Sequence, residues 1–208
     1  MFSQIDHLVY AVPELESGSR HIQQLLGVPV EGGGRHPDRG THNHLIGLGP
    51  HSYLEIIAKE PNRPENAPPC WMGLDGLQAA RMLRWAVKRP NLDHCHRLAE
   101  KHQIPLGAIA QGRRQLASGD WLSWQLTEPG TQAQASILPF FLDWGQSLHP
   151  SQNMTGPCRI ESIALYHPQA PQLQEQLDVF DLPHQVQTAE EARIVIRLQT
   201  PNGLVELS

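Results

Sequence analysis

One order of elements occurs three times along this chain, and it limits the fold more than any single motif does. Near residues 5–60, 81–144 and 159–208, the hydrophobic pattern predicts a strand, a helix and then three strands. Each unit has an apolar sheet face that it cannot cover alone, so it needs a partner. The pattern therefore predicts an α+β fold built from repeated βαβββ units.

The boundaries of the units follow from composition. The predicted strands of the first unit are 5–12, 28–31, 42–49 and 52–59, with a helix from residue 14 to 26. The second unit has predicted strands at 81–88, 105–110, 121–127 and 135–142. We assign residues 1–60 to the first unit, 61–80 to a proline-rich linker, 81–145 to the second unit and 159–208 to a shorter third unit, all within one fold.

Composition excludes several classes of function. The 208 residues have a formal net charge of -5, which gives no basic surface for nucleic acid or anionic lipid. No apolar run approaches the ~20 residues that a membrane helix needs. The first residues lack the sections of a signal peptide, so we expect a cytoplasmic protein. The three cysteines lack the spacing of a disulfide framework or a zinc ribbon.

Two of the apolar strands each contain one residue suited to chemistry. Side chains alternate between the faces of a strand, so His7 shares a face with Val9 and Ala11. By the same count, Glu55 shares a face with Tyr53 and Ile57. An imidazole and a carboxylate on one sheet face form half of a metal site, or a buried hydrogen-bonded pair without a metal.

Polar residues between these strands are further candidates for ligand binding. The glycine-rich segment 32–40 is either a flexible turn or a lid whose Arg35 or Arg39 meets an anionic group. Thr41 and Asn43 share one strand face and are candidate donors to a substrate carbonyl. His42 and His44 share the other face, and the sequence does not say which of the two faces lines a cleft.

Several motifs resemble a known group of proteins. They are Ile5-Asp6-His7-Leu8-Val9 and Tyr53-Leu54-Glu55-Ile56-Ile57, together with the segments 40–49 and 138–141. With the order of the elements, they are similar to glyoxalase-like domain proteins of the vicinal oxygen chelate superfamily, which includes glyoxalase I, extradiol dioxygenases and bleomycin-binding proteins. The resemblance implies that two units pair their curved mixed sheets into a cleft, with the helices outside.

The resemblance also implies which positions would hold a metal. Each of two paired units would give one ligand from its first strand and one from its last, and His7 and Glu55 fill both positions in the first unit. The second unit has Trp85, and Pro139 or Phe141, at those positions, and neither pair can ligate a metal. The third unit has Ser162 and Glu206 there, so the four-ligand pattern is broken.

The function implied is that of a glyoxalase-like small-molecule enzyme of lyase, isomerase or dioxygenase type. A divalent metal (Zn, Ni, Mn or Fe) on His7 and Glu55 would chelate a substrate with neighbouring oxygens. Glu206, or His42 with His44, would supply a third ligand, and a free Glu55 or Glu206 would act as general base.

The alternative is a metal-free protein that binds or sequesters a small molecule. Its aromatic cleft would be lined by His7, Tyr53, Trp85 and Phe141. In either case the expected partner is a small molecule, and a homodimer is compatible with the resemblance. The substrate, the metal and the two units that pair stay open.

Overall fold

The computed structural model describes residues 2, 4–64, 66–116, 118–129 and 137–208. The first unit consists of β1 (Ile5–Ala11), α1 (Leu15–Leu26), β2 (Gly32–His36), β3 (Thr41–Gly47) and β4 (Tyr53–Lys59). A short 3-10 helix, η1 (Trp71–Gly76), precedes the second unit, which consists of β5 (Arg81–Lys88), α2 (Leu92–Lys101), β6 (Ile109–Gln115), β7 (Trp121–Thr127) and β8 (Phe140–Asp143). After η2 (Pro150–Asn153) come β9 (Arg159–His167), α3 (Ala170–Val179), β10 (Val186–Thr188), β11 (Arg193–Thr200) and β12 (Gly203–Leu207).

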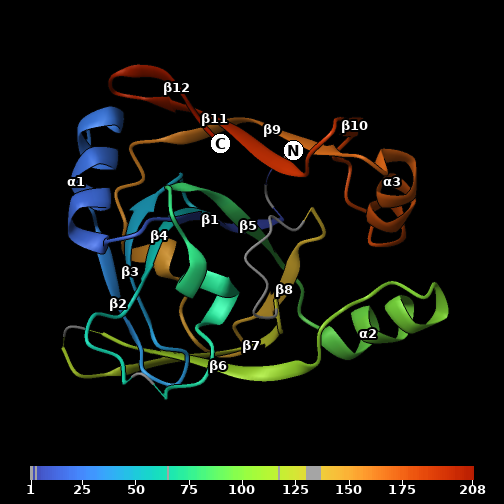
Figure 1. Cartoon of the computed structure of the whole chain (residues 1–208), viewed down its shortest axis with the longest axis horizontal. Coiled ribbons are helices and arrows are strands. Elements are labelled where there is room, and N and C mark those ends of the chain that lie inside the picture. The colour runs from blue at the N-terminus through green and yellow to red at the C-terminus, as the bar shows by residue number, and fades with distance from the viewer. Residues whose placement is uncertain (1, 3, 65, 117, 130–136) are drawn as a thin grey trace.

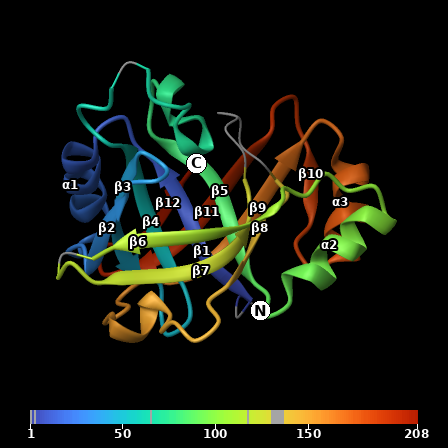
Figure 2. The ribbon, with the colours of Figure 1, turned by 90° about the horizontal axis from the view of Figure 1, so that it is seen from below.

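The first two units close into one barrel. Its strands follow the order β1-β4-β3-β2-β6-β7-β8-β5, with the three helices outside it (Figures 1 and 2). The predicted α+β fold with curved mixed sheets is confirmed. The structure also answers which units pair, because β1 of the first unit lies antiparallel to β5 of the second.

The two contacts between the halves of the barrel differ in extent. β1 and β5 are paired at six positions, from Ile5 opposite Val87 to Ala11 opposite Arg81. On the other side, β2 and β6 are paired at one position, Arg35 opposite Gln115. The barrel wall is therefore continuous along β1 and β5 and barely closed between β2 and β6.

The third unit forms a separate sheet in the order β10-β9-β11-β12, which lies across the outside of β1 and β5 (Figure 1). Ile194, Ile196 and Leu198 of β11 belong to the same buried cluster as Leu8 of β1. Rings from the two parts also meet, since Phe141 and Phe180 have centroids 4.9 Å apart. This outer core thus joins the third unit to the barrel.

Helix α1 shows how the sequence sets an element and ties it to its neighbours. The side chain of Glu14 accepts hydrogen bonds from the first free backbone N–H groups, and Gly27 ends the helix with a φ of 74°. The Asn202 amide, from the turn between β11 and β12, donates to the carbonyls of Gln24 and Leu25 at 2.9 and 3.2 Å. The third unit therefore caps a helix of the first.

Three predicted strands are shifted in the structure. The strand predicted at 28–31 is wrong, because β2 begins at Gly32 within the segment interpreted as a loop. Its glycines allow a close approach of backbones: a Cβ at Gly33 would lie 2.3 Å from the Asn43 carbonyl oxygen. The strand predicted at 105–110 begins at Ile109 instead, and of the strand predicted at 135–142 the structure shows β8, while residues 130–136 lie outside its described part.

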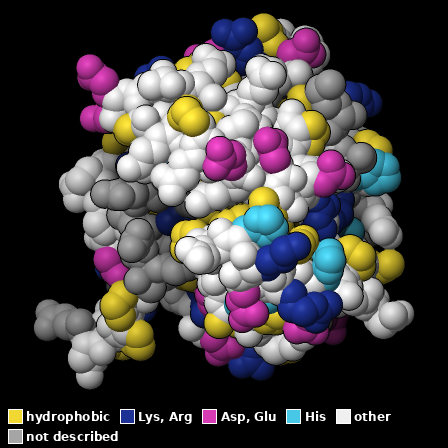
Figure 3. Space-filling view, turned by 90° about the vertical axis from the view of Figure 1, so that its right-hand side faces the viewer, with side chains coloured by type: hydrophobic (Ala, Val, Ile, Leu, Met, Phe, Trp, Pro, Cys, Tyr) yellow, Lys and Arg dark blue, Asp and Glu magenta, His cyan; other side chains and the backbone are white. Residues whose placement is uncertain are grey.

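The surface around α2 and α3 has mixed charge. Acidic, basic and histidine side chains are interspersed there, and the visible hydrophobic atoms lie in small patches (Figure 3). Among the described helices, none is long and apolar enough to cross a membrane.

Candidate functional site

An irregularity in β1 places two polar side chains together inside the barrel. Ile5 lies opposite Val87 and His7 lies opposite Ala86, so Asp6 is an extra residue without a partner in β5. Such a bulge breaks the alternation of side chains. The Asp6 carboxylate therefore reaches the His7 ring, with Oδ1 2.7 Å from Nδ1.

Asp6 is the most enclosed charge of this group, with no exposed surface. The Trp144 indole N–H donates to its Oδ2 at 2.7 Å, and His149 Nε2 lies 3.3 Å from the same oxygen without the alignment of a hydrogen bond. Burial alone would raise the pKa of Asp6, but the imidazoles of His149 and His7 outweigh it and hold the pKa well below its usual range. Asp6 is therefore a carboxylate that only accepts hydrogen bonds.

Glu55 faces His7 from the neighbouring strand. β4 runs parallel to β1 with Tyr53 opposite His7, and these two rings stack with centroids 4.8 Å apart. Glu55 Oε2 lies 3.6 Å from His7 Nε2, while its Oε1 accepts a hydrogen bond from the Asn43 amide at 2.5 Å. The predicted juxtaposition of His7 and Glu55 on one inner face is present in the structure.

These groups border a small enclosed cavity of about 10 Å³, which is about the room of one water molecule. Its walls also include the aromatic side chains of Trp71, Trp124, Phe140 and Trp144. Burial, together with the nearby carboxylates of Asp6 and Glu55, raises the pKa of Tyr53 well above its usual value, so its phenol stays protonated. The cavity thus combines an acid–base array with an aromatic wall.

Three of the seven buried side-chain polar atoms that lack a hydrogen bond in the described part of the chain belong to residues that line this cavity. Asn43 Oδ1, Trp71 Nε1 and Arg114 Nε lack a hydrogen bond within the described residues, and all three side chains line the cavity. Buried polar groups in folded proteins are nearly always satisfied, so a cluster of exceptions indicates a place where a ligand completes them.

Comparison with known proteins identifies the family of the chain. A family model described as a glyoxalase-like domain matches residues 5–180. The chain belongs to the glyoxalase-like domain family. The resemblance inferred from the sequence is confirmed.

Several solved structures are similar to this chain, and one of them shows the same fold. A hypothetical protein from Staphylococcus aureus is similar to this glyoxalase-like domain protein with a TM-score of 0.70 at 15% identity, over 91% of this chain and 87% of that chain. Methylmalonyl-CoA epimerase from Mycobacterium tuberculosis matches with a TM-score of 0.43 at 17% identity, over 67% of this chain and 87% of that chain. A Streptomyces coelicolor methylmalonyl-CoA epimerase in complex with 2-nitronate-propionyl-CoA matches with 0.45 at 14% identity, over 67% and 96%. A search of curated proteins finds no match.

Two aromatic residues expected in the cleft of this glyoxalase-like domain lie on the other side of the sheet. Trp85 and Phe141 are fully buried in the outer core, and the Trp85 indole N–H donates to the Ile137 carbonyl at 2.7 Å. Val9 lies opposite Arg84 and Tyr10 lies opposite Met82, so the pairing skips one residue of β5. This bulge reverses the alternation of side chains along the strand. The prediction that Trp85 and Phe141 line the cavity is therefore wrong, and Phe140 occupies that wall instead.

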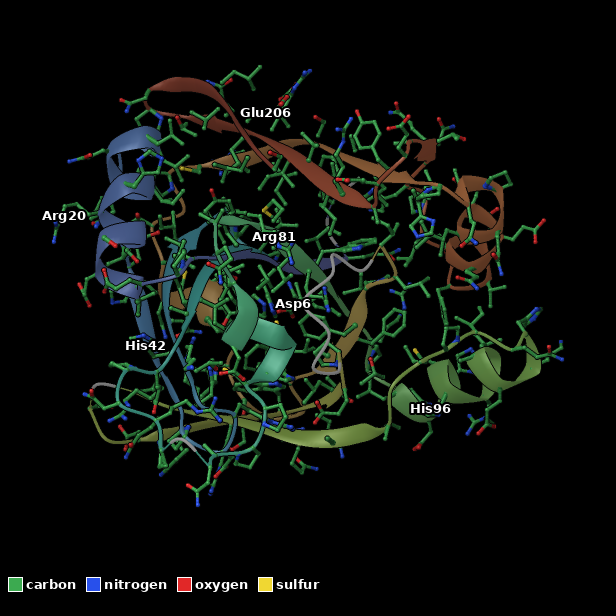
Figure 4. The ribbon with its side chains drawn as sticks, in the orientation of Figure 1. Asp6, Arg20, His42, Arg81, His96 and Glu206 are labelled. Carbon is green, nitrogen blue, oxygen red and sulfur yellow. The ribbon has the colours of Figure 1, made fainter. Side chains whose placement is uncertain are left out.

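Glu206 also lies away from the cavity. It is half-exposed on β12 and forms an ion pair with Arg197 of β11 at 2.9 Å, and Figure 4 shows it on the third sheet while Asp6 lies inside the barrel. The prediction that Glu206 joins His7 and Glu55 as ligand or base is wrong, because the third sheet packs on the outside of the barrel.

The strand β3 settles the question left open for its histidines. His44 Nδ1 lies 2.9 Å from Ser19 Oγ of α1, so His42 and His44 are on the helix side. Asn43 and Thr41 point inward: Asn43 contacts Glu55, and Thr41 Oγ1 lies 2.9 Å from His36 Nδ1.

Arg39 has protein partners in the structure. Its guanidinium pairs with Glu128 and lies 5.5 Å from the centre of the Trp71 ring. It is thus near the helix η1, which contributes Trp71 to the cavity wall. A role of Arg39 toward an anionic substrate stays a prediction.

Sequence reasoning missed Asp6, His36, Arg114 and His149. Asp6 adjoins His7 in the quoted motif, but strict alternation placed it on the other face, and a bulge has no signature in this sequence. Two adjacent arginines, Arg113 and Arg114, favour a solvated turn in the sequence, yet Arg114 is 4% exposed within β6.

The donor set does not fit a resident divalent metal. Among the described residues, no group of three or more His, Cys, Asp or Glu side chains is placed to hold one. A catalytic metal usually takes three protein ligands, whereas His7 and Glu55 supply two. The cavity wall also includes the Arg114 guanidinium, whose positive charge opposes a second cation.

Proposed function

We propose that this cavity is the active site of a glyoxalase-like enzyme of isomerase or lyase type. The reaction proposed is proton transfer at a carbon next to a carbonyl group of a small molecule. The observation that supports it is the facing pair of His7 Nε2 and Glu55 Oε2, 3.6 Å apart, with His7 Nδ1 held by Asp6.

The tautomer of His7 follows from its partner. The Asp6 carboxylate can only accept, so His7 Nδ1 carries a hydrogen and donates it at 2.7 Å. In the neutral ring, Nε2 is then an acceptor directed toward Glu55. The two atoms are 3.6 Å apart, too close for a group in line between them, so a substrate proton would reach both from the side that faces the cavity.

The proposed step uses both groups as acid and base. His7 Nε2 takes the proton from the substrate carbon, and the electron pair of that C–H bond moves to the carbonyl oxygen as an enolate. The step starts from the form in which Glu55 carries a proton and His7 Nε2 does not. Glu55 gives its proton to the carbon or to the oxygen, and exchange with solvent then removes the proton from His7 and returns one to Glu55. Asp6 stabilises the imidazolium that forms and keeps its orientation.

A ring-cleaving dioxygenase is not proposed, because its iron would need a third protein ligand that this donor set lacks. Metal-free sequestration of a small molecule is the second candidate. The aromatic wall formed by Tyr53, Trp71, Trp124, Phe140 and Trp144 favours it.

Deuterium incorporation distinguishes the two candidates. Small 2-oxo and 3-oxo carboxylates are incubated with the protein in D2O and followed by proton NMR. We expect exchange at the carbon next to the carbonyl, and a loss of about 10²-fold or more in His7→Gln and Glu55→Gln. His94→Gln, at an exposed position of α2, is the matched control.

Treatment with EDTA followed by desalting should leave the exchange rate unchanged, because the proposed step uses only side chains. Binding of these compounds without exchange would overturn the proton-transfer proposal and favour sequestration. Exchange that is lost with EDTA and restored by a divalent metal would contradict the assignment of the donor set.

A further inference from the structure

Arg114 is a buried cation that has no anionic partner among the described residues. Its side chain is 4% exposed, and neither an ion pair nor a hydrogen bond to its guanidinium is present within the described part of the chain, where Nε is unsatisfied. Its neighbour Arg113, in contrast, is exposed and paired with Asp38 at 2.6 Å. Burial of an unpaired charge opposes folding, so its presence requires another reason.

The strand β2 makes room for this arginine. A Cβ at Gly34 would lie 2.9 Å from Arg114 Cγ and 3.1 Å from Cδ. The stem of Arg114 therefore packs against a strand that has no side chain at this position. Burial, and then the charge of Arg114, lower the pKa of the neighbouring His36 to about 3, so His36 stays neutral beside it.

Arg114 lies where two hollows meet. It lines the cavity with His7 and Glu55, and it also lines a groove of about 1030 Å³ on the outer side. Asn43 is the other residue common to both. The groove runs past Gly32, Gly33 and Gly34 of β2, at the seam where β2 and β6 are paired at a single position.

The groove has an apolar wall. It includes Val30, Leu116, Leu122 and Met154, together with Trp121 and Leu148, which are 45% and 64% exposed. These last two are among the three exposed large hydrophobic residues identified in the described structure. Exposed apolar side chains gathered at a hollow indicate a binding surface.

We propose that Arg114 binds the carboxylate of a monoanionic small molecule whose apolar body lies in this groove. A guanidinium forms two parallel hydrogen bonds with a carboxylate. The Trp71 indole N–H, which has no hydrogen-bond partner in the described part of the chain, is a neutral donor on the same wall. A phosphate dianion is disfavoured, since Arg114 is the one Lys or Arg among the described residues of the cavity wall and the Glu55 carboxylate lines the same cavity. This inference rests on the proposed function in one respect only: a carboxylate on Arg114 would lie at the entrance to the cavity that contains His7 and Glu55.

Isothermal titration calorimetry with four probes tests the proposal. The probes are 4-phenylbutyrate, its neutral analogue 4-phenylbutanol, acetate and inorganic phosphate. We expect 4-phenylbutyrate to bind most tightly, because it alone has both the carboxylate and an apolar body. Equal affinity for 4-phenylbutanol, tighter binding of phosphate, or no binding of 4-phenylbutyrate would each overturn the proposal.

Variants separate the two parts of the site. Arg114→Met should weaken 4-phenylbutyrate about 30-fold or more and leave 4-phenylbutanol unchanged. Leu148→Ser should weaken 4-phenylbutyrate but not acetate. Arg197→Gln, which removes the same charge from the far sheet, is the matched control.

The stability of the apo protein gives an independent readout. Arg114→Met should unfold at the same or a higher denaturant concentration than the wild type, because it removes an unpaired buried charge. A marked loss of stability with unchanged 4-phenylbutyrate affinity would assign Arg114 a structural role and overturn the inference.

The two proposals can fail separately. His7→Gln should still bind 4-phenylbutyrate. Arg114-dependent binding without deuterium exchange on any compound would overturn the proton-transfer proposal alone. Exchange that depends on His7 but not on Arg114 would overturn the carboxylate site alone.

Discussion

The proposed chemistry of the cavity depends on Asp6, although it is His7, and not Asp6, that faces the Glu55 carboxylate. It fixes the hydrogen on His7 Nδ1 and so leaves Nε2 free to accept. Asn at this position can donate as well as accept, and donation to Nδ1 selects the other tautomer.

Asp6→Asn is therefore expected to lower the exchange rate by about 10²–10⁴-fold. The readout specific to this positioning role is the pH profile of exchange, which should change in shape, while a merely structural role would lower the rate equally at every pH. Proton NMR between pH 5 and pH 9 measures it.

His36, in the wall of the cavity, makes the free energy of unfolding depend on pH under acidic conditions. Burial and the charge of Arg114 lower its pKa from 6.5 to about 3, so the unfolded chain binds a proton between these values that the folded chain does not. Stability contributed by neutral His36 is complete above pH 6.5 and falls as the pH decreases through this window, by about 1.4 kcal/mol per pH unit.

His36→Gln should therefore reduce the pH dependence of the unfolding free energy between pH 6 and pH 4. Urea denaturation at several pH values checks this prediction. An unchanged slope would contradict it. Some slope should remain, because burial also lowers the pKa of His149 and His184.

At the scale of elements, the sequence correctly predicted strands with a clear hydrophobic period. It failed where contacts with neighbouring strands determine the local structure. The alternation in β1 and β4 correctly predicted that Leu8 and Leu54 face away from His7 and Glu55. It failed where a bulge reversed the alternation, at Asp6 and at Trp85. It also failed at β2, whose glycines favour a loop locally but pair with β3 in the fold.

The C-terminal ends of two helices offer a matched pair of variants. Gln103 follows α2 with a φ of 54°, and the next amide, of Ile104, donates to the Ala99 carbonyl at 2.8 Å. This is the geometry in which glycine is preferred. Gln103→Gly should raise the unfolding free energy by about 0.5–1 kcal/mol, because a side chain is strained at positive φ.

Gly27→Ala at the end of α1 should have the opposite effect, a loss of at least about 1 kcal/mol. Its φ is 74°, and the added Cβ would lie 2.5 Å from Asn202 Oδ1. Denaturant titrations followed by circular dichroism measure both variants. A loss of stability in Gln103→Gly would show that its side chain has a role beyond the helix end.

At the scale of the molecule, one outer core joins all three units. Ile196 of β11 is fully buried in the same cluster as Leu8 of β1 and Val87 of β5. Ile196→Ala should lower the unfolding free energy by about 3 kcal/mol.

The whole protein should still unfold in a single transition, because barrel and third sheet share these contacts. Calorimetry together with tryptophan fluorescence tests this, since Trp85 packs at 5.0 Å against His184. Two separate transitions would contradict a shared core and favour independent folding of residues 159–208.

The two halves of the barrel are paired at six positions along β1 and β5 but at one between β2 and β6. This difference determines how a solute can reach the cavity. A rotation of one half about the β1–β5 line separates β2 from β6 at the cost of one paired backbone position and the ion pairs Arg39–Glu128 and Asp38–Arg113, and it leaves the six β1–β5 positions intact. Backbone amides of Arg35 and Gln115 would then exchange with solvent sooner than those of Leu8 and Trp85. A solute can be admitted to the closed interior by a rigid-body hinge motion, with no strand having to melt.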